Sequence, residues 1–276
     1  MKTLIPVAVL AATTLLAPLA AHAQTSQTYN GNGLTGFGGV LGNGSLTVSS
    51  TQSSATDGNI TFTFNPSGTF NNNDVVLYID SVAGGLSDTS SLVDNGDPAR
   101  EAISGYNANN TNVTPNGPTR TQVNFAQGFG ADYAISFQNN AAIGVFSVPS
   151  PGNNFLNFVT GQTPTNGGPY TVTVTDAQLG LTPGGTFSFV GTLIDPNAAY
   201  RSNETLGTSV TNPGTAGDTP NAGFTGTQTF SNSNTFTTDA PAAAPEPSSL
   251  IVLGIMGLGL GALMLNARRR TASDAQ

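Results

Sequence analysis

Apolar and polar residues alternate in short runs along most of the chain, as in Ile60–Phe64 and Tyr170–Val174. Successive side chains of an extended strand point to opposite faces, so this alternation predicts half-buried β-strands rather than helices. Runs rich in Gly, Pro and Asn, such as Asn65–Gly68 and Pro183–Gly185, separate the segments and predict turns. We expect strands over residues 45–50, 60–64, 75–82, 122–125, 133–137, 143–148, 155–160, 170–174, 187–190 and 234–238.

Many short strands separated by turns predict an all-β fold, and we expect an antiparallel β-sandwich of jelly-roll-like type over residues 24–239. A right-handed β-solenoid is the alternative, but the sequence has no repeat of fixed period. No amphipathic helix is expected in this region. Residues 208–238, rich in Gly, Thr, Asn and Ser, predict a loosely ordered edge. Residues 240–247 form a linker that ends in a Pro-Glu-Pro motif.

The N-terminus has the three parts of a secretory signal peptide. Lys2 supplies the positive start, Leu4–Leu19 the apolar stretch, and Ala21-His22-Ala23 the small-x-small cleavage site. We expect residues 1–23 to be removed by cleavage after Ala23. An uncleaved anchor, the alternative, would need a longer apolar run. The sequence therefore predicts an exported protein.

An uncharged apolar run, Leu250–Leu265, is followed by an arginine triplet near the C-terminus. As a helix the run is about 24 Å long, and flanking residues extend it to the minimum length that spans a bilayer. We expect a transmembrane helix over residues 248–267 and, by the positive-inside rule, a cytoplasmic Arg-rich tail over residues 268–276. A buried core helix is the alternative, but the glycines of the run are better tolerated in lipid than in a water-soluble helix.

The order of a Pro-Glu-Pro motif, an apolar span and an arginine cluster resembles the PEP-CTERM sorting signal of exported proteins in Gram-negative bacteria. The residues that carry the resemblance are Pro245, Glu246, Pro247, Arg268, Arg269 and Arg270. The resemblance implies that an exosortase-type membrane enzyme recognises the Pro-Glu-Pro region and removes the anchor during export. It also implies an association with exopolysaccharide or biofilm production. It indicates a route to the cell surface or extracellular space, and no activity for the β domain.

The region between the two terminal signals is strongly acidic. It contains three arginines and thirteen carboxylates, eleven of them Asp, so its formal net charge is three minus thirteen, or −10. A nucleic-acid partner requires a basic patch that neutralises phosphates. The charge therefore argues against nucleic-acid binding.

The mature chain lacks the residues on which much hydrolytic and redox chemistry depends. It has no cysteine, and its one histidine, His22, and its one lysine, Lys2, lie in the signal peptide. This excludes a thiol nucleophile, a Ser-His-Asp triad, a Cys/His zinc site and a Schiff-base lysine. It also excludes disulfides, so stability must come from a large core. We expect no enzymatic activity, and no cofactor apart from calcium.

The densest group of carboxylates is the segment Asp88–Glu101. Carboxylate and amide oxygens in a Gly-containing loop suit calcium, which binds about six to eight oxygen ligands with flexible geometry. Asp94 and Asp97, in the sequence Asp-Asn-Gly-Asp, are the candidate ligands. The same sequence is typical of an ordinary turn, and the EF-hand spacing is absent, so both interpretations stay open. Asn71–Asp74 is a second, weaker oxygen-rich loop.

Three functions are compatible with the chain, and we expect the first. The first is a structural or adhesive protein of the cell surface or extracellular matrix, with extracellular polysaccharide as its partner. The second is a carbohydrate-binding module, calcium-dependent if the Asp-Asn-Gly-Asp turn binds the ion. Tyr106 and Tyr200 are its candidate stacking rings, because most other aromatics occupy strand positions typical of a core. The third is a secreted glycoside hydrolase with Glu101 and Glu204, the only glutamates of the β domain, as paired carboxylates.

Overall fold

The computed structural model describes residues 24–241 apart from residues 69, 71, 112–116, 140–141, 151, 165–166, 198–199 and 212–225. The predicted signal peptide, residues 1–23, lies outside the described residues. The Pro-Glu-Pro motif, the predicted transmembrane helix and the Arg-rich tail lie outside them as well, beyond residue 241. Within the described ranges, no helix has the length and apolarity needed to cross a membrane.

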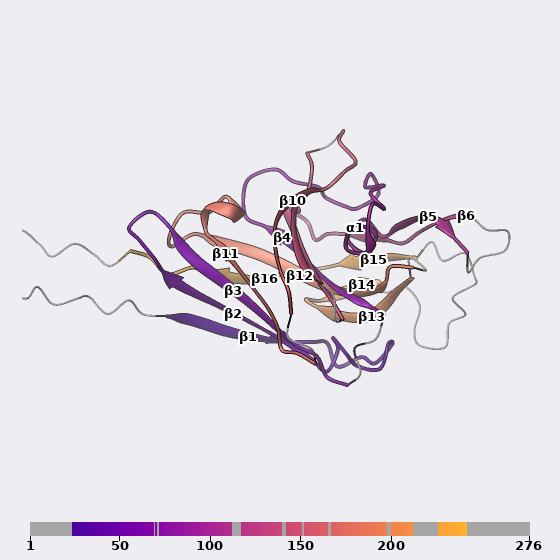
Figure 1. Cartoon of the computed structure of the whole chain (residues 1–276), viewed down its shortest axis with the longest axis horizontal. Coiled ribbons are helices and arrows are strands. Elements are labelled where there is room, and N and C mark those ends of the chain that lie inside the picture. Colours follow the sequence, from indigo (N-terminus) through magenta and orange to yellow (C-terminus); the bar gives the residue numbers. More distant parts are fainter. Residues whose placement is uncertain are drawn as a thin grey trace, which may run out of the picture. The chain divides into compact units, whose positions relative to one another are not determined.

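A four-stranded antiparallel sheet forms one layer of the fold (Figure 1). Its strands, in spatial order, are β1 (Thr25–Asn30), β2 (Ser45–Gln52), β3 (Gly58–Asn65) and β11 (Tyr170–Thr175). In β2 and β3 every second side chain is buried, as the alternation predicts. Outward-facing threonines pair across neighbouring strands, with the hydroxyl oxygens of Thr61 and Thr173 2.9 Å apart.

A seven-stranded antiparallel sheet forms the second layer. Its strands are β10 (Asn157–Gln162), β9 (Ile143–Ser147), β8 (Tyr133–Gln138), β4 (Asp74–Asp80), β12 (Thr186–Asp195) and β13 (Tyr200–Leu206) in spatial order, with β16 (Asn234–Thr237) also paired to β12. Unlike β2 and β3, β4 is buried on both faces. Double-sided burial explains why its sequence is a continuous apolar run rather than an alternating one.

The two sheets pack face to face over one hydrophobic core, which contains buried side chains from both. Aromatic rings meet across the interface. Tyr29 lies edge-to-face on Phe189 with the ring centroids 4.7 Å apart, and the rings of Phe64 and Phe137 are 5.9 Å apart. The prediction of an all-β fold, with antiparallel sheets packed as in a sandwich, is confirmed.

The outer face of the seven-stranded sheet is covered by a further layer, and β7 is the one element of this layer that the sequence predicted. Its elements are α1 (Pro98–Ser104), β5 (Tyr106–Asn110), β6 (Gly117–Arg120), β7 (Gln122–Asn124), β14 (Ser209–Thr211) and β15 (Thr227–Phe230). Val76 and Tyr78 of β4 belong to the same buried cluster as Ile103 of α1 and Phe230 of β15. The seven-stranded sheet therefore separates two cores. A 3-10 helix, η1 (Ala177–Leu179), follows β11 and belongs to the first core through Leu179.

Each predicted strand overlaps a strand of the structure, because alternation is a local signal. No amphipathic helix was expected in this region, but the structure contains the short helix α1. Asp97 caps α1 by accepting a hydrogen bond from the Arg100 N–H at 2.9 Å, Pro98 begins the helix, and Gly105 ends it at a φ of 62°. Within residues 208–238, predicted as a loosely ordered edge, the described parts form β14, β15 and β16, and β16 matches the strand predicted over residues 234–238.

Candidate functional site

A hollow of about 460 Å³ opens between the start of α1 and the edge of the seven-stranded sheet formed by β8, β9 and β10. This volume lies within the usual range of small-molecule sites. The long side chains that line it are Asp97, Arg100, Gln138, Phe146, Phe158 and Gln162. Aromatic rings, amide groups and the ion pair of Arg100 with Asp97 therefore line a single concave site.

Two glycines make room for this hollow. Gly144 of β9 and Gly161 of β10 are paired in register. A Cβ atom on Gly144 would lie 2.5 Å from the ring of Phe146, and one on Gly161 would lie 3.2 Å from the ring of Phe158. A side chain at position 144 would collide with the Phe146 ring, and one at position 161 would approach the Ile143 carbonyl oxygen at 2.8 Å as well as the Phe158 ring. The two glycines therefore leave the space in which both rings pack.

Phe158 is the exposed ring of the hollow, with 60 % of its surface accessible. It lies edge-to-face against Phe146, and the ring centroids are 5.7 Å apart. Phe155, 58 % exposed, precedes the same strand and does not line the hollow. Most aromatic residues were expected to pack in the core, and these two phenylalanines are exceptions. The reason is that β10 is an edge strand with little structure over it.

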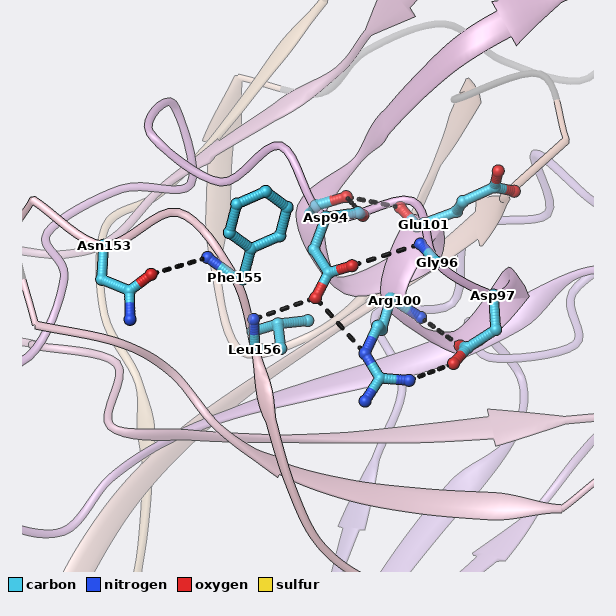
Figure 2. Close-up of polar contacts among 9 residues, drawn as sticks. Asp94, Gly96, Asp97, Arg100, Glu101, Asn153, Phe155 and Leu156 are labelled. Atoms are coloured by element: carbon cyan, nitrogen blue, oxygen red, sulfur yellow. Dashed lines mark hydrogen bonds and ion pairs between the residues drawn. The ribbon is translucent and has the colours of Figure 1, made fainter.

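Arg100 joins the two carboxylates that were predicted as calcium ligands (Figure 2). Its Nε lies 3.3 Å from Asp94 Oδ2, and its Nη1 donates to Asp97 Oδ2. Asp94 also accepts hydrogen bonds from the N–H groups of Gly96 at 3.2 Å and Leu156 at 3.0 Å. The structure therefore brings Asp94 and Asp97 close together, but both carboxylates already accept hydrogen bonds from groups of the protein. Calcium binding there would have to displace these donors, and it stays a prediction.

Asp74, at the start of β4, is buried and holds the Gln138 amide at the margin of the hollow. Gln138 Nε2 donates to Asp74 Oδ2 at 2.8 Å, and the Ser136 hydroxyl donates to the same oxygen at 3.3 Å. Burial raises the pKa of Asp74 to about 7; the two hydrogen bonds oppose this rise, and the charges of Asp195 and Asp97 add to it. The sequence had indicated Asp74 only as part of an oxygen-rich loop.

A second hollow of about 270 Å³ adjoins the first. The two share Gln162 and Thr163, and Thr171 of β11 also lines the second. The site therefore extends from β10, at the edge of one sheet, toward β11, at the edge of the other. We call the two adjoining hollows the β10 groove.

Glu101 and Glu204, the predicted catalytic pair, lie on opposite faces of the seven-stranded sheet. Glu101 is on α1, which packs on the outer face. Glu204 is fully buried, and its carboxylate accepts hydrogen bonds of 2.6–3.0 Å from the loop between β1 and β2, on the side of the first core. The four donors are the N–H groups of Phe37, Gly39, Leu41 and Gly42. The structure does not bring the two glutamates together as an acid–base pair.

The two tyrosines predicted as exposed stacking rings are engaged within the fold. Tyr200 is buried and stacks on Phe37, with the ring centroids 5.4 Å apart, so its predicted exposure was wrong. Tyr106 is half-buried, and the Arg120 guanidinium lies 4.9 Å from its ring centroid. Neither residue lines the β10 groove. Asn157, Gly161 and Gln162 surround Phe158 in β10 and are polar or small residue types that buried strands rarely use. They were the sequence feature that could have indicated an exposed edge strand here.

Within the described residues, no group of three or more His, Cys, Asp or Glu side chains is arranged to hold a metal ion. Comparisons with protein-family models, with curated proteins and with solved structures found no match. The features of the molecule that bear on function are therefore the groove, the charge of the domain and the terminal signals predicted from the sequence.

Proposed function

We propose that this protein is exported to the cell envelope or the extracellular matrix, where its β domain adheres to extracellular polysaccharide through the β10 groove. The proposal joins two functions compatible with the sequence, a structural or adhesive protein and a carbohydrate-binding module. The observation that carries it is the exposed ring of Phe158 in a groove that also holds the amides of Gln138 and Gln162.

The chemistry of these side chains matches that of a sugar ring. A pyranose has an apolar face of C–H groups that packs on an aromatic ring, and hydroxyl groups around its rim that need polar partners. Phe158 offers the ring, while Gln138 and Gln162 offer both donors and acceptors. The second hollow extends the site along the sheet edges, which suits a chain of sugars better than a single compact ligand.

The charge of the groove favours a neutral saccharide. Among the described residues that line it, Arg100 is the one cation, and the carboxylates of Asp94 and Asp97 compensate its charge. The guanidinium also lies 4.9 Å from the centroid of the Phe146 ring. A uronate polymer would meet no uncompensated cation there, and the domain as a whole is acidic. We therefore infer that neutral polysaccharides bind and polyanionic ones do not.

The terminal signals supply the proposed location. The signal peptide directs export, and the PEP-CTERM-like tail is the substrate of an exosortase-type enzyme that acts at the Pro-Glu-Pro motif. Until then the helix over residues 248–267 anchors the protein in the membrane. We also propose that the sandwich is jelly-roll-like, which is supported by its two antiparallel sheets that share one core.

Binding of the full-length protein to immobilised neutral and uronate-containing polysaccharides tests the function. We expect binding to a neutral polymer and a loss of affinity of about tenfold in Phe158→Ala, since a stacked ring contributes on the order of 1.4 kcal/mol. Phe155→Ala is the matched control, because Phe155 is equally exposed but does not line the groove. Equal losses in the two variants, or no binding to any polymer, would contradict a role for the groove.

The sorting route has its own test, mass spectrometry of the protein recovered from the producing cell. We expect a mature N-terminus at Gln24 and a C-terminus that ends upstream of the arginine cluster. A mature chain that still carries Arg268, Arg269 and Arg270 would contradict processing at the Pro-Glu-Pro motif.

A further inference from the structure

Asp176 is a buried carboxylate without a hydrogen-bond donor. It follows β11 and precedes η1, 1 % of its surface is exposed, and neither side-chain oxygen has a partner among the described residues. Its backbone is well anchored, because its N–H donates to the Gly58 carbonyl at 2.9 Å and its carbonyl accepts from the N–H groups of Leu179 and Leu181. The fold therefore places this carboxylate, and a buried polar group without a partner requires an explanation.

A second side-chain oxygen without a partner among the described residues belongs to Gln52, on the strand that pairs with Gly58. Gln52 of β2 is paired in register with Gly58 of β3 and is 8 % exposed. Its Nε2 donates to the carbonyls of Ser54 and Asp57, whereas its Oε1 has no partner in the described part of the chain. A Cβ atom on Gly58 would lie 2.7 Å from Asp176 Oδ2. The Asp176 carboxylate thus fills the space next to Gln52 that a side chain at position 58 would otherwise take.

The surroundings of these oxygens are negative. Burial, followed by the charge of Asp57, raises the pKa of Asp176, and the charge of Asp239 adds to the rise. The nearby Gly58 N–H opposes the rise in pKa, but its hydrogen bond, 3.1 Å long, goes to Asp57 Oδ1. Over the described ranges, ion pairs join only Arg100 to Asp94 and Asp97, so an arginine does not compensate Asp176. A carboxylate that loses its hydration without gaining a donor or a cation is costly to bury.

We propose that the Asp176 carboxylate and Gln52 Oε1 bind a calcium ion at this end of the sandwich, with Asp57 as a further source of carboxylate oxygen. Calcium accepts carboxylate and amide oxygens together in irregular arrangements, whereas magnesium needs near-ideal octahedral geometry. The ion replaces the hydration that both side chains lose on burial. The site uses an amide oxygen, so it differs from a cluster of three or more acidic side chains. It is also separate from the β10 groove and from Asp94 and Asp97.

Thermal unfolding of the full-length protein in chelator and in excess calcium tests this site. Calcium at about one hundred times its Kd should raise the Tm of the wild-type protein by about 5 °C or more. Asp176→Asn should abolish the shift while it leaves the protein folded, because the amide keeps the shape and removes the uncompensated charge. Asp94→Asn is the matched control and should keep the calcium response of the wild type.

Calorimetric titration of the chelated protein with calcium gives the stoichiometry independently of unfolding. We expect one site in the wild type and in Asp94→Asn, and none in Asp176→Asn. A wild-type Tm that does not respond to calcium overturns the proposal and means that a proton on Asp176 balances the burial. A response that Asp94→Asn removes and Asp176→Asn retains also overturns it, because the ion then binds at the Asp-Asn-Gly-Asp turn.

Discussion

Glu204 and Asp176 are both carboxylates buried beside the first core, but the fold surrounds them differently. Glu204 accepts four backbone N–H groups from one loop, whereas neither oxygen of Asp176 has a donor among the described residues. Hydrogen bonds replace the hydration that a carboxylate loses on burial. Burial by itself therefore does not mark a site. A buried carboxylate with donors supports the fold, and one without them needs an ion or a proton.

The largest expected effect is the loss of stability in Glu204→Gln. The new amide replaces one acceptor oxygen with an NH2 group that faces two of the four N–H donors. We expect the free energy of unfolding, measured by urea titration, to fall by about 3–5 kcal/mol. A loss below about 1 kcal/mol would mean that the loop between β1 and β2 does not depend on this carboxylate. It would contradict the view that donors distinguish Glu204 from Asp176.

Asp74 is intermediate between Glu204, which has four donors, and Asp176, which has none among the described residues. It accepts two side-chain hydrogen bonds, and its pKa is raised to about 7. The folded-state pKa exceeds the unfolded value of about 3.9, so folding favours the protonated form. The stability that this group contributes is complete below about pH 4 and is lost as the pH rises to about 7, by roughly 4 kcal/mol in total.

Urea unfolding of the wild type and of Asp74→Asn at a series of pH values measures this contribution. The difference in unfolding free energy between the two proteins should change in the direction that favours the variant as the pH rises from about 4 to 7. A difference that is constant over this range would show that Asp74 titrates normally in the folded protein.

A smaller effect is expected for Asp176→Asn when calcium is removed by chelation. The substitution removes an uncompensated charge and no hydrogen bond that the described residues make, so the unfolding free energy should rise by up to about 1 kcal/mol. Because Glu204→Gln makes the same chemical change at the other carboxylate, it is the internal control. Equal losses in the two variants would show that Asp176 has partners within the fold.

The smallest effect is expected for the exposed rings. Phe158→Ala and Phe155→Ala should each change the unfolding free energy by less than about 0.5 kcal/mol, because both side chains are more than half exposed. Phe64→Ala, at a fully buried ring of the first core, should cost about 3–5 kcal/mol and serves as the reference. A large loss of unfolding free energy in Phe158→Ala would mean that the ring stabilises the sheet edge. A lower affinity of this variant for polysaccharide would then not report on contacts in the groove.

The start of α1 was predictable from local residues, although no helix was predicted there. Asp97, Pro98 and Gly105 occupy the cap, first-turn and end positions that helices favour. The same Asp97 had been considered only as a calcium ligand or a turn residue. A seven-residue helix has too few apolar positions for a periodic signal, so its caps were the only local sign of it.

The β10 groove was not predictable in the same way. Phe158 and Phe64 are identical in type and both lie in strands, yet one is 60 % exposed and the other is fully buried. What separates them is the position of β10 at the edge of the seven-stranded sheet. Strand order depends on contacts between segments far apart in the chain, which a local pattern does not encode.

The sequence by itself determined the strand content, the acidic charge and the absence of Cys, His and Lys from residues 24–276, and it predicted the two terminal signals, because each is a property of composition or of neighbouring residues. Only the tertiary structure decided which face of each strand is covered and which carboxylates acquire donors. Asp94, Asp176 and Glu204 are all carboxylates, but the fold gives them different partners: an arginine and two N–H groups for Asp94, no donor among the described residues for Asp176, and four N–H groups for Glu204. The four donors to Glu204 come from a loop more than 160 residues away in the chain, so the partners of such a buried charge are known only once the chain is folded.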